Sequence, residues 1–137
     1  PDGRVVLASR SAGSADVVLH LGLGEAWTAT LLPLDGGILA PALAVAEDGR
    51  VAVAVDDATG APAVALLDLA DLEGGSGPEA RWSRGDIVLT RRPAVAFDAA
   101  GGLRLWATAV DGEVFAAASD PGVPPATAWT PAVRRGD

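Results

Sequence analysis

Short runs of alternating side-chain size recur along the chain and are separated by turn residues. In residues 50–55 larger and smaller side chains alternate with a period of two, which is the period of a β-strand. Asp-Gly pairs at 2, 48 and 111 and the loop 73–78 interrupt such runs, and these residue types favour turns. The pattern predicts eleven strands, near 5–10, 16–22, 26–33, 41–47, 50–56, 62–69, 80–90, 93–98, 103–110, 112–119 and 127–133.

The alanine-rich stretch 61–72 also has the composition of a helix. Pro62 near its beginning lacks a backbone N–H, and proline is tolerated only in the first turn of a helix. The stretch also occupies a strand position in a repeat that runs through the whole chain. We therefore predict a strand followed by a turn here.

The repeat is visible where the segment beginning at Pro41 reappears at Pro93, an offset of 52 residues. A Trp followed by Thr or Ser marks three places, at Trp27, Trp82 and Trp129. The chain thus forms a single all-β repeat domain over 1–137, with units of about 2–47, 48–100 and 101–137. The first unit lacks the opening Pro-Ala strand that the other two possess.

About four short strands per unit of roughly fifty residues is typical of a β-propeller blade. A blade buries its faces only against its neighbours, and propellers typically have about four to eight blades. Three blades are too few, so we expect the ring to be closed by oligomerisation or by the rest of a longer chain. An ordinary two-sheet β-sandwich is the alternative fold.

Composition narrows the function to binding rather than catalysis. The chain is 50% hydrophobic, has a net charge of -8 and contains one His and no Cys. These counts exclude disulfides and thiolate chemistry and leave little material for metal or acid-base sites, so we expect a non-enzyme with no cofactor and no metal. The acidic charge argues against nucleic acid as a partner, and no apolar run is long enough for a membrane span. The compartment stays open, with a secreted or cell-surface location favoured.

Residues 93–115, followed by Ala-Trp-Thr at 128–130, resemble the repeat of the bacterial PLL-type and tectonin-like lectin propellers. In that family a Pro-Ala strand leads to an Asp-Gly turn, an apolar strand ending in an aromatic residue, a second Asp-Gly and a Trp followed by Ser or Thr. The likeness covers most of residues 2–133 and is clearest in the third unit. It implies sugar binding in pockets between adjacent blades, without catalysis.

The candidate ligand-binding residues are Trp106, Arg104, Asp111 and Glu113. Trp106 and Arg104 lie two residues apart, so one face of a strand presents both, and the two carboxylates supply acceptors for sugar hydroxyls. Ala8 and Ala54 stand where the resemblance places an aromatic in the other units. The partner is therefore a glycan or, in the alternative interpretation, another protein held by a structural scaffold with degenerate pockets. Self-association or contact with the remainder of a longer polypeptide is expected in either case.

Three other features have ordinary structural interpretations. The recurring Trp27, Trp82 and Trp129 are expected to pack between blades. His20 lies near a position where the family often carries a His, but a lone His is typically a partly exposed strand residue. A Ser-His-Asp triad from Ser9 or Ser11, His20 and Asp16 lacks a nucleophile-elbow pattern, which disfavours hydrolase chemistry.

Overall fold

A computed structural model describes residues 4–10, 16–32, 37–70, 80–83, 88–109, 112, 114–119 and 133–135. Within them the chain forms three antiparallel sheets, each a simple meander. Sheet 1 contains β1 (Val5–Arg10), β2 (Val17–Leu23) and β3 (Ala26–Leu32). Sheet 2 contains β4 (Ala42–Val45), β5 (Arg50–Asp56), β6 (Pro62–Asp68) and β7 (Ala80–Ser83). Sheet 3 contains β8 (Ala94–Phe97), β9 (Leu103–Thr108), β10 (Val114–Ser119) and β11 (Val133–Arg135).

Each predicted strand has a counterpart in these sheets, and the bounds of β7 and β11 differ from the predicted ones. Of the predicted strand 80–90, β7 is found at 80–83, residues 84–87 lie outside the described residues, and Leu89 forms an isolated bridge with Ala109. β11 is found at 133–135, whereas the prediction was 127–133, of which 127–132 lies outside the described residues. The alanine-rich stretch forms β6, as predicted, and the next residues, Leu69 and Ala70, are helical.

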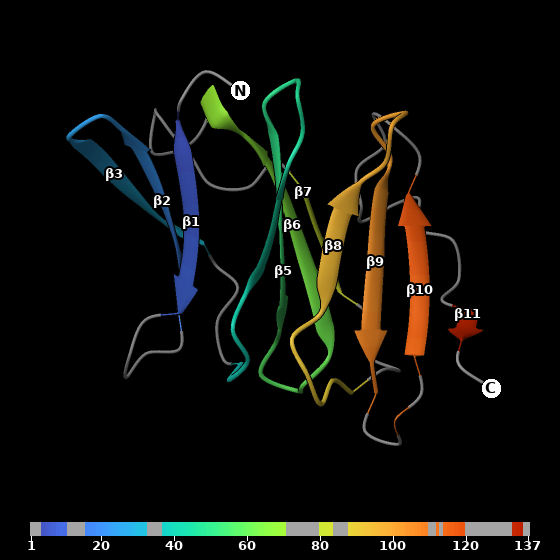
Figure 1. The fold of residues 1–137 in the computed structure, drawn as a ribbon. Helices are drawn as coiled ribbons and strands as arrows, with labels where there is room; N and C mark the ends of the chain where they lie inside the picture. Colours follow the sequence, from blue (N-terminus) through green and yellow to red (C-terminus); the bar gives the residue numbers. More distant parts are fainter. Residues whose placement is uncertain are drawn as a thin grey trace.

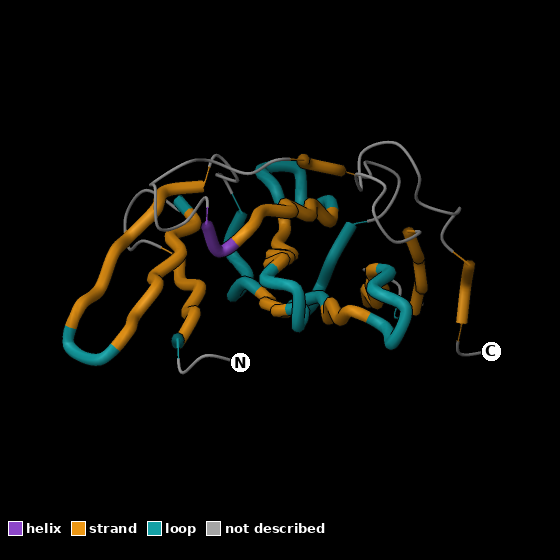
Figure 2. Tube along the Cα trace, turned by 90° about the horizontal axis from the view of Figure 1, so that it is seen from above, coloured by secondary structure: helices purple, strands orange, loops and turns teal. Residues whose placement is uncertain are grey.

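Sheet 2 lies between the other two sheets, which flank it on opposite sides (Figure 1). Figure 2 shows the same three groups of strands in succession from above. A series of three sheets differs from the two facing sheets of a sandwich, and it fits the arrangement expected of propeller blades. Among the described residues sheet 1 has three strands, and β1 corresponds in the repeat to β5 and not to β4, which agrees with the predicted lack of an opening strand.

The alternation of side-chain size decides which face of a strand meets which neighbour. Val51 and Val53 of β5 point toward sheet 1 and pack on Leu19, while Ala52 and Ala54 point toward sheet 3. Sheet 2 is consequently buried on both faces, and its β5 valines have no exposed surface. Burial of a Val or Leu side chain contributes roughly 1.5–3 kcal/mol, so these two inter-sheet layers are the main source of cohesion.

A buried ion pair joins the ends of β1 and β5. Arg10 Nη2 lies 2.8 Å from Asp56 Oδ1, and the two side chains are only 11% and 4% exposed. The backbone N–H groups of Ile38 and Leu39 also donate to the Asp56 carboxylate, at 2.9 and 3.0 Å. Gly37 is required beside this carboxylate, because a Cβ there would overlap the backbone oxygen and side chain of Asp56. The pair thereby ties sheet 1, sheet 2 and the segment before β4 together.

The register does not place Trp27 and Trp82 at equivalent positions, contrary to the spacing argument. Trp27 pairs with Gly22, whose partner on β1 is Val5. Trp82 pairs with Val64, whose partner on β5 is Ala54, and Ala54 corresponds in the repeat to Ala8 rather than to Val5. Trp27 is 51% exposed on the outer face of sheet 1, so it does not pack between two sheets of this chain. Trp129 lies outside the described residues.

Candidate functional site

A hollow of about 560 Å³ opens where sheets 2 and 3 meet. It is lined by the β4–β5 turn and the β8–β9 turn, which are the same turn of the repeat in neighbouring sheets. The lining residues are Val45, Ala46, Glu47, Asp48, Arg50, Phe97, Asp98, Ala99, Ala100 and Gly101. We call it the sheet 2–sheet 3 hollow.

Asp98 organises the turn on the sheet 3 side. Its Oδ1 accepts hydrogen bonds from the backbone N–H groups of Gly102, at 2.8 Å, and Ala100, at 3.0 Å. Gly101 supplies the left-handed conformation that closes the turn, with φ of 87°. The Gly102 N–H, with help from Ala100 and the Arg104 guanidinium, lowers the pKa of Asp98 from its ordinary value of 3.8. A fixed negative charge therefore stands at the rim of the hollow.

Asp48 also accepts hydrogen bonds within its own turn, the β4–β5 turn, but it stands at the repeat position of Ala100 and not of Asp98. The Arg50 backbone N–H and the Arg50 Nε both donate to its carboxylate, at 3.2 and 2.8 Å. These contacts, the backbone one first, lower the pKa of Asp48 from 3.8. Glu47 beside it is exposed. The hollow thus carries carboxylates on both sides.

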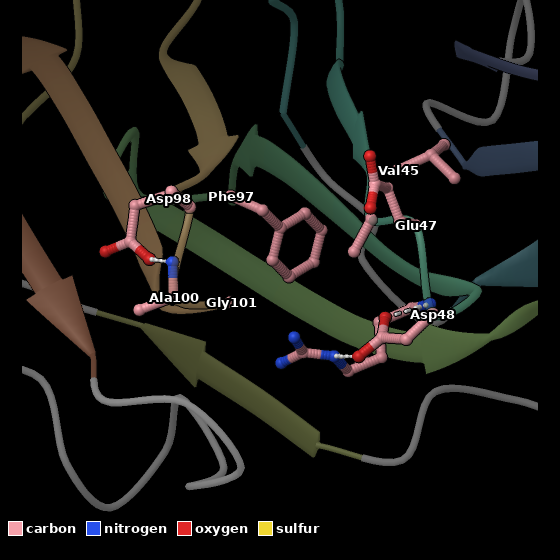
Figure 3. Close-up of a pocket in the computed structure, with 10 residues that line it drawn as sticks. Val45, Glu47, Asp48, Phe97, Asp98, Ala100 and Gly101 are labelled. Carbon is pink, nitrogen blue, oxygen red and sulfur yellow. Dashed lines mark hydrogen bonds and ion pairs between the residues drawn. The ribbon is translucent and has the colours of Figure 1, made fainter.

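Phe97 provides an aromatic surface in the middle of this polar rim. Its side chain lies between Glu47 and Asp48 on one side and Asp98 on the other (Figure 3). The Arg50 guanidinium carbon is 5.0 Å from the ring centroid, a cation–π distance. A planar cation, an aromatic ring and several carboxylates are the groups that bind a polyhydroxylated ligand with one apolar side.

A second hollow, of about 360 Å³, occupies the corresponding place between sheets 1 and 2. Arg4 lines it at the repeat position of Arg50, so both hollows contain an arginine. Val45 and Ala46 stand where the larger hollow has Phe97 and Asp98. The sheet 1–sheet 2 hollow therefore has no aromatic ring and no counterpart of the Asp98 carboxylate, although Glu47 lines it.

The predicted pair Arg104 and Trp106 does share one face of β9, the face turned away from sheet 2. Trp106 is 42% exposed. Arg104 is held by Asp98, with Nη2 at 2.9 Å and Nε at 3.1 Å from Oδ2. Neither side chain lines the sheet 2–sheet 3 hollow. Asp111 and Glu113 lie outside the described residues, so their place relative to Trp106 stays a prediction.

Two residues of the triad that the sequence disfavours do lie together. Ser9 Oγ is 3.3 Å from His20 Nε2 on the exposed face of sheet 1. In the part of the chain that the structure describes, no carboxylate hydrogen bond to His20 is found, so the pair lacks the acid that orients the imidazole. The described part of the chain also contains no group of three potential metal ligands and no helix long and apolar enough to cross a bilayer.

The sequence analysis missed Phe97 and Arg50, although the repeat contained a signal for each. Phe97 interrupts the pattern by replacing Val45, and Arg50 recurs as Arg4 after an Asp-Gly pair. Spacing alone did not reveal that residues 47 positions apart would meet. They do so because equivalent turns of adjacent sheets lie side by side.

No family model matches the sequence, and no curated protein is similar to it at a significant level. A solved structure is similar, described as "Structure of a fucose lectin from Kordia zhangzhouensis in complex with methyl-fucoside". The likeness has a TM-score of 0.69 at 12% sequence identity, and it covers 98% of this chain and 92% of that one. At this identity it shows the fold alone: the chain has a lectin-like all-β fold over nearly its whole length.

Proposed function

We propose that the protein is a non-catalytic carbohydrate-binding propeller segment of the PLL or tectonin-like type, which holds a sugar in the sheet 2–sheet 3 hollow. The observation that carries the proposal is the Phe97 ring beside Arg50 and two turn carboxylates at a junction between sheets. An aromatic face packs on the C–H groups of a pyranose, and charged groups hydrogen-bond its hydroxyls. The similar solved structure is a fucose lectin, which makes methyl-fucoside the first ligand to test.

The test is a titration with methyl-fucoside and a glycan array, using wild type and two variants of the hollow. Phe97→Leu keeps an apolar side chain next to Leu103 but removes the flat ring. Arg50→Gln removes the cation. We expect Arg50→Gln to weaken glycan binding about tenfold or more, because a hydrogen bond to a charged group contributes about 1.5–3 kcal/mol. We expect Phe97→Leu to weaken glycan binding as well, because the flat face on which the pyranose C–H groups pack is lost.

Arg91→Gln is the matched control, since Arg91 is exposed and does not line the hollow. It loses the same charge and should bind the glycan as wild type does. Equal weakening by Arg91→Gln would mean that net charge, and not the hollow, attracts the ligand. Wild-type binding by both hollow variants would move the site elsewhere.

The sequence predicts a second sugar site, which contains Trp106, Arg104, Asp111 and Glu113. Trp106 supports it by its exposed ring, and Trp106→Ala in the same titration tests it directly. If this variant alone loses the glycan while Phe97→Leu keeps it, the outer face of β9 is the site.

A protein-interaction scaffold is the second candidate function. Large apolar side chains are exposed on the outer face of sheet 1, including Leu7 and Leu31, and such a surface favours a protein partner. A glycan array without any response, together with association through this face, would favour the scaffold over the lectin.

A further inference from the structure

A third hollow, of about 380 Å³, opens where the edges of the three sheets meet. β1, β4 and β8 are each an end strand of their sheet, and β4 lies next to both β1 and β8. The hollow is lined by consecutive residues of these segments, at 6–8, 41–43 and 92–95. Consecutive side chains of a strand point to opposite faces, so each run borders the hollow with its backbone edge. We call it the edge hollow, and it shares no lining residue with the sheet 2–sheet 3 hollow.

Two backbone N–H groups face the open edges of β4 and β8. The N–H of Ala46 donates to the first residue of β5, and the N–H of Asp98 donates to the residue before β9, both at 2.8 Å. Hydrogen-bonded positions alternate along an antiparallel pair, and Leu43 and Val95 each stand three residues before these donors. Their N–H groups therefore point away from the paired neighbour, and both residues line the edge hollow.

Arg92 adds an exposed cation to these two donors. Three other arginines, at positions 10, 50 and 104, are held by carboxylates. In the part of the chain that the structure describes, neither Arg92 nor its neighbour Arg91 makes an ion pair or a hydrogen bond. No acidic residue is among those that line the edge hollow, although the chain has a net charge of -8. The hollow is thus a positive place on an acidic protein.

The other side chains around the edge hollow are apolar. Val6, Ala8 and Leu43 pack against the core between sheets 1 and 2, and Val95 packs against the clusters between sheets 2 and 3. These side chains are held in place by the core, so the walls of the hollow are formed before a ligand arrives.

We infer that the edge hollow binds a small monocarboxylate with an apolar body. The carboxylate accepts hydrogen bonds from the Arg92 guanidinium and from the backbone N–H groups of Leu43 and Val95, and bonds between charged groups are the stronger kind. The apolar body of the ligand covers the Val and Leu side chains of the walls. The volume lies within the range of about 300–1,000 Å³ that is usual for small-molecule sites. This site is separate from the proposed sugar site and does not depend on it.

A titration followed by the amide NMR signals of the 137-residue protein tests the inference. Benzoate is the probe, benzyl alcohol is its neutral counterpart, and acetate is a carboxylate without the apolar body. We expect a dissociation constant on the order of 1 mM for benzoate, with the largest shifts at Leu43 and Val95, and binding at least about tenfold weaker for the other two compounds. Equal binding of benzyl alcohol would overturn the inference, and so would equal binding of acetate.

Arg92→Gln and Arg91→Gln are a matched pair of variants. Both residues are exposed and both substitutions remove one positive charge, but only Arg92 lines the edge hollow. Arg92→Gln should weaken benzoate binding about tenfold, because it removes the charged donor, and Arg91→Gln should bind benzoate as wild type does. Equal weakening by the two variants would overturn the inference, because net charge would then attract the ligand.

The position of the shifts separates this site from the sugar site. Benzoate shifts centred on the β4–β5 and β8–β9 turns would place the carboxylate in the sheet 2–sheet 3 hollow and overturn the inference. The absence of a saturable response up to about 20 mM benzoate would overturn it as well. Neither result would bear on glycan binding, which the methyl-fucoside titration measures by itself.

Discussion

The two junctions between sheets use the same backbone frame for different purposes. Between sheets 1 and 2, Val51, Val53 and Leu19 form a large apolar layer, and the buried Arg10–Asp56 pair fastens its end. Between sheets 2 and 3 the apolar residues form two smaller clusters, in which Ala54 and Val64 meet Leu105 and in which Ala52 and Leu66 meet Leu103. The Arg104–Asp98 ion pair lies within sheet 3 and is exposed.

The sizes of the two hollows do not follow the sizes of the apolar layers. The junction with the larger apolar cluster has the smaller hollow, in which Val45 and Ala46 hold the repeat positions that Phe97 and Asp98 hold in the sheet 2–sheet 3 hollow. The carboxylates of the sheet 2–sheet 3 hollow belong to turns, whereas Phe97 at the end of β8 belongs both to the hollow and to the apolar layer. Substitutions in the turns should therefore change ligand binding with less effect on cohesion than substitutions of inward strand residues.

The largest expected effect is on stability, from the ion pair of the first junction. Asp56→Asn leaves the Arg10 guanidinium buried without its carboxylate, which should lower the free energy of unfolding by about 3–5 kcal/mol. Denaturant unfolding measures this value. Asp98→Asn makes the same chemical change in the exposed pair and should have a much smaller effect, because solvent screens that pair. Equal losses from both variants would contradict the contrast between the buried pair that joins sheets 1 and 2 and the exposed pair within sheet 3.

An intermediate effect is expected on ligand stoichiometry. The double substitution Val45→Phe with Ala46→Asp gives the first hollow the ring and carboxylate of the second, beside Arg4, at two positions that also line the second hollow. Calorimetric titration with the glycan that wild type binds should then show two sites per chain instead of one, with affinities within about tenfold of each other. Stoichiometry that stays at one would mean that the frame of the first hollow is too narrow for the sugar.

The smallest effect is the dependence of stability on acid pH. Asp48 and Asp98 have pKa values below the ordinary 3.8 when folded, so the folded state binds their protons less readily than the unfolded state does. Their contribution is present above pH 3.8 and is lost as pH falls through the lowered folded values. Thermal unfolding between pH 5 and pH 2 should show this loss, reduced in Asp48→Asn and Asp98→Asn. A wild-type acid profile in both variants would contradict the assignment.

Much of the fold was predictable because strand signals are local. Residues 50–55 show their alternation directly, and Asp-Gly pairs mark the turns, so the elements and the missing strand of sheet 1 follow from the sequence. The Trp spacing was misleading because composition does not fix the register of a strand. Trp27 lies opposite the partner of Val5, which is three residues before Ala8, the repeat equivalent of the position reached from Trp82, and an odd shift exchanges the two faces of a strand. β11 extends to Arg135, two residues beyond the predicted end at 133, because composition does not fix where pairing ends.

By itself the sequence determined the fold class, the repeat and the scarcity of reactive side chains. Only the tertiary structure decided that Arg50 and Phe97 meet, since they belong to turns of different sheets that become neighbours when the apolar faces pack. It also decided that Arg104 turns to Asp98 and that Val5 and Leu7 are exposed while Val51 and Val53 are buried. The same local pattern gives opposite environments because burial depends on which sheet stands next to a face, and that is a property of the assembled structure rather than of the strand.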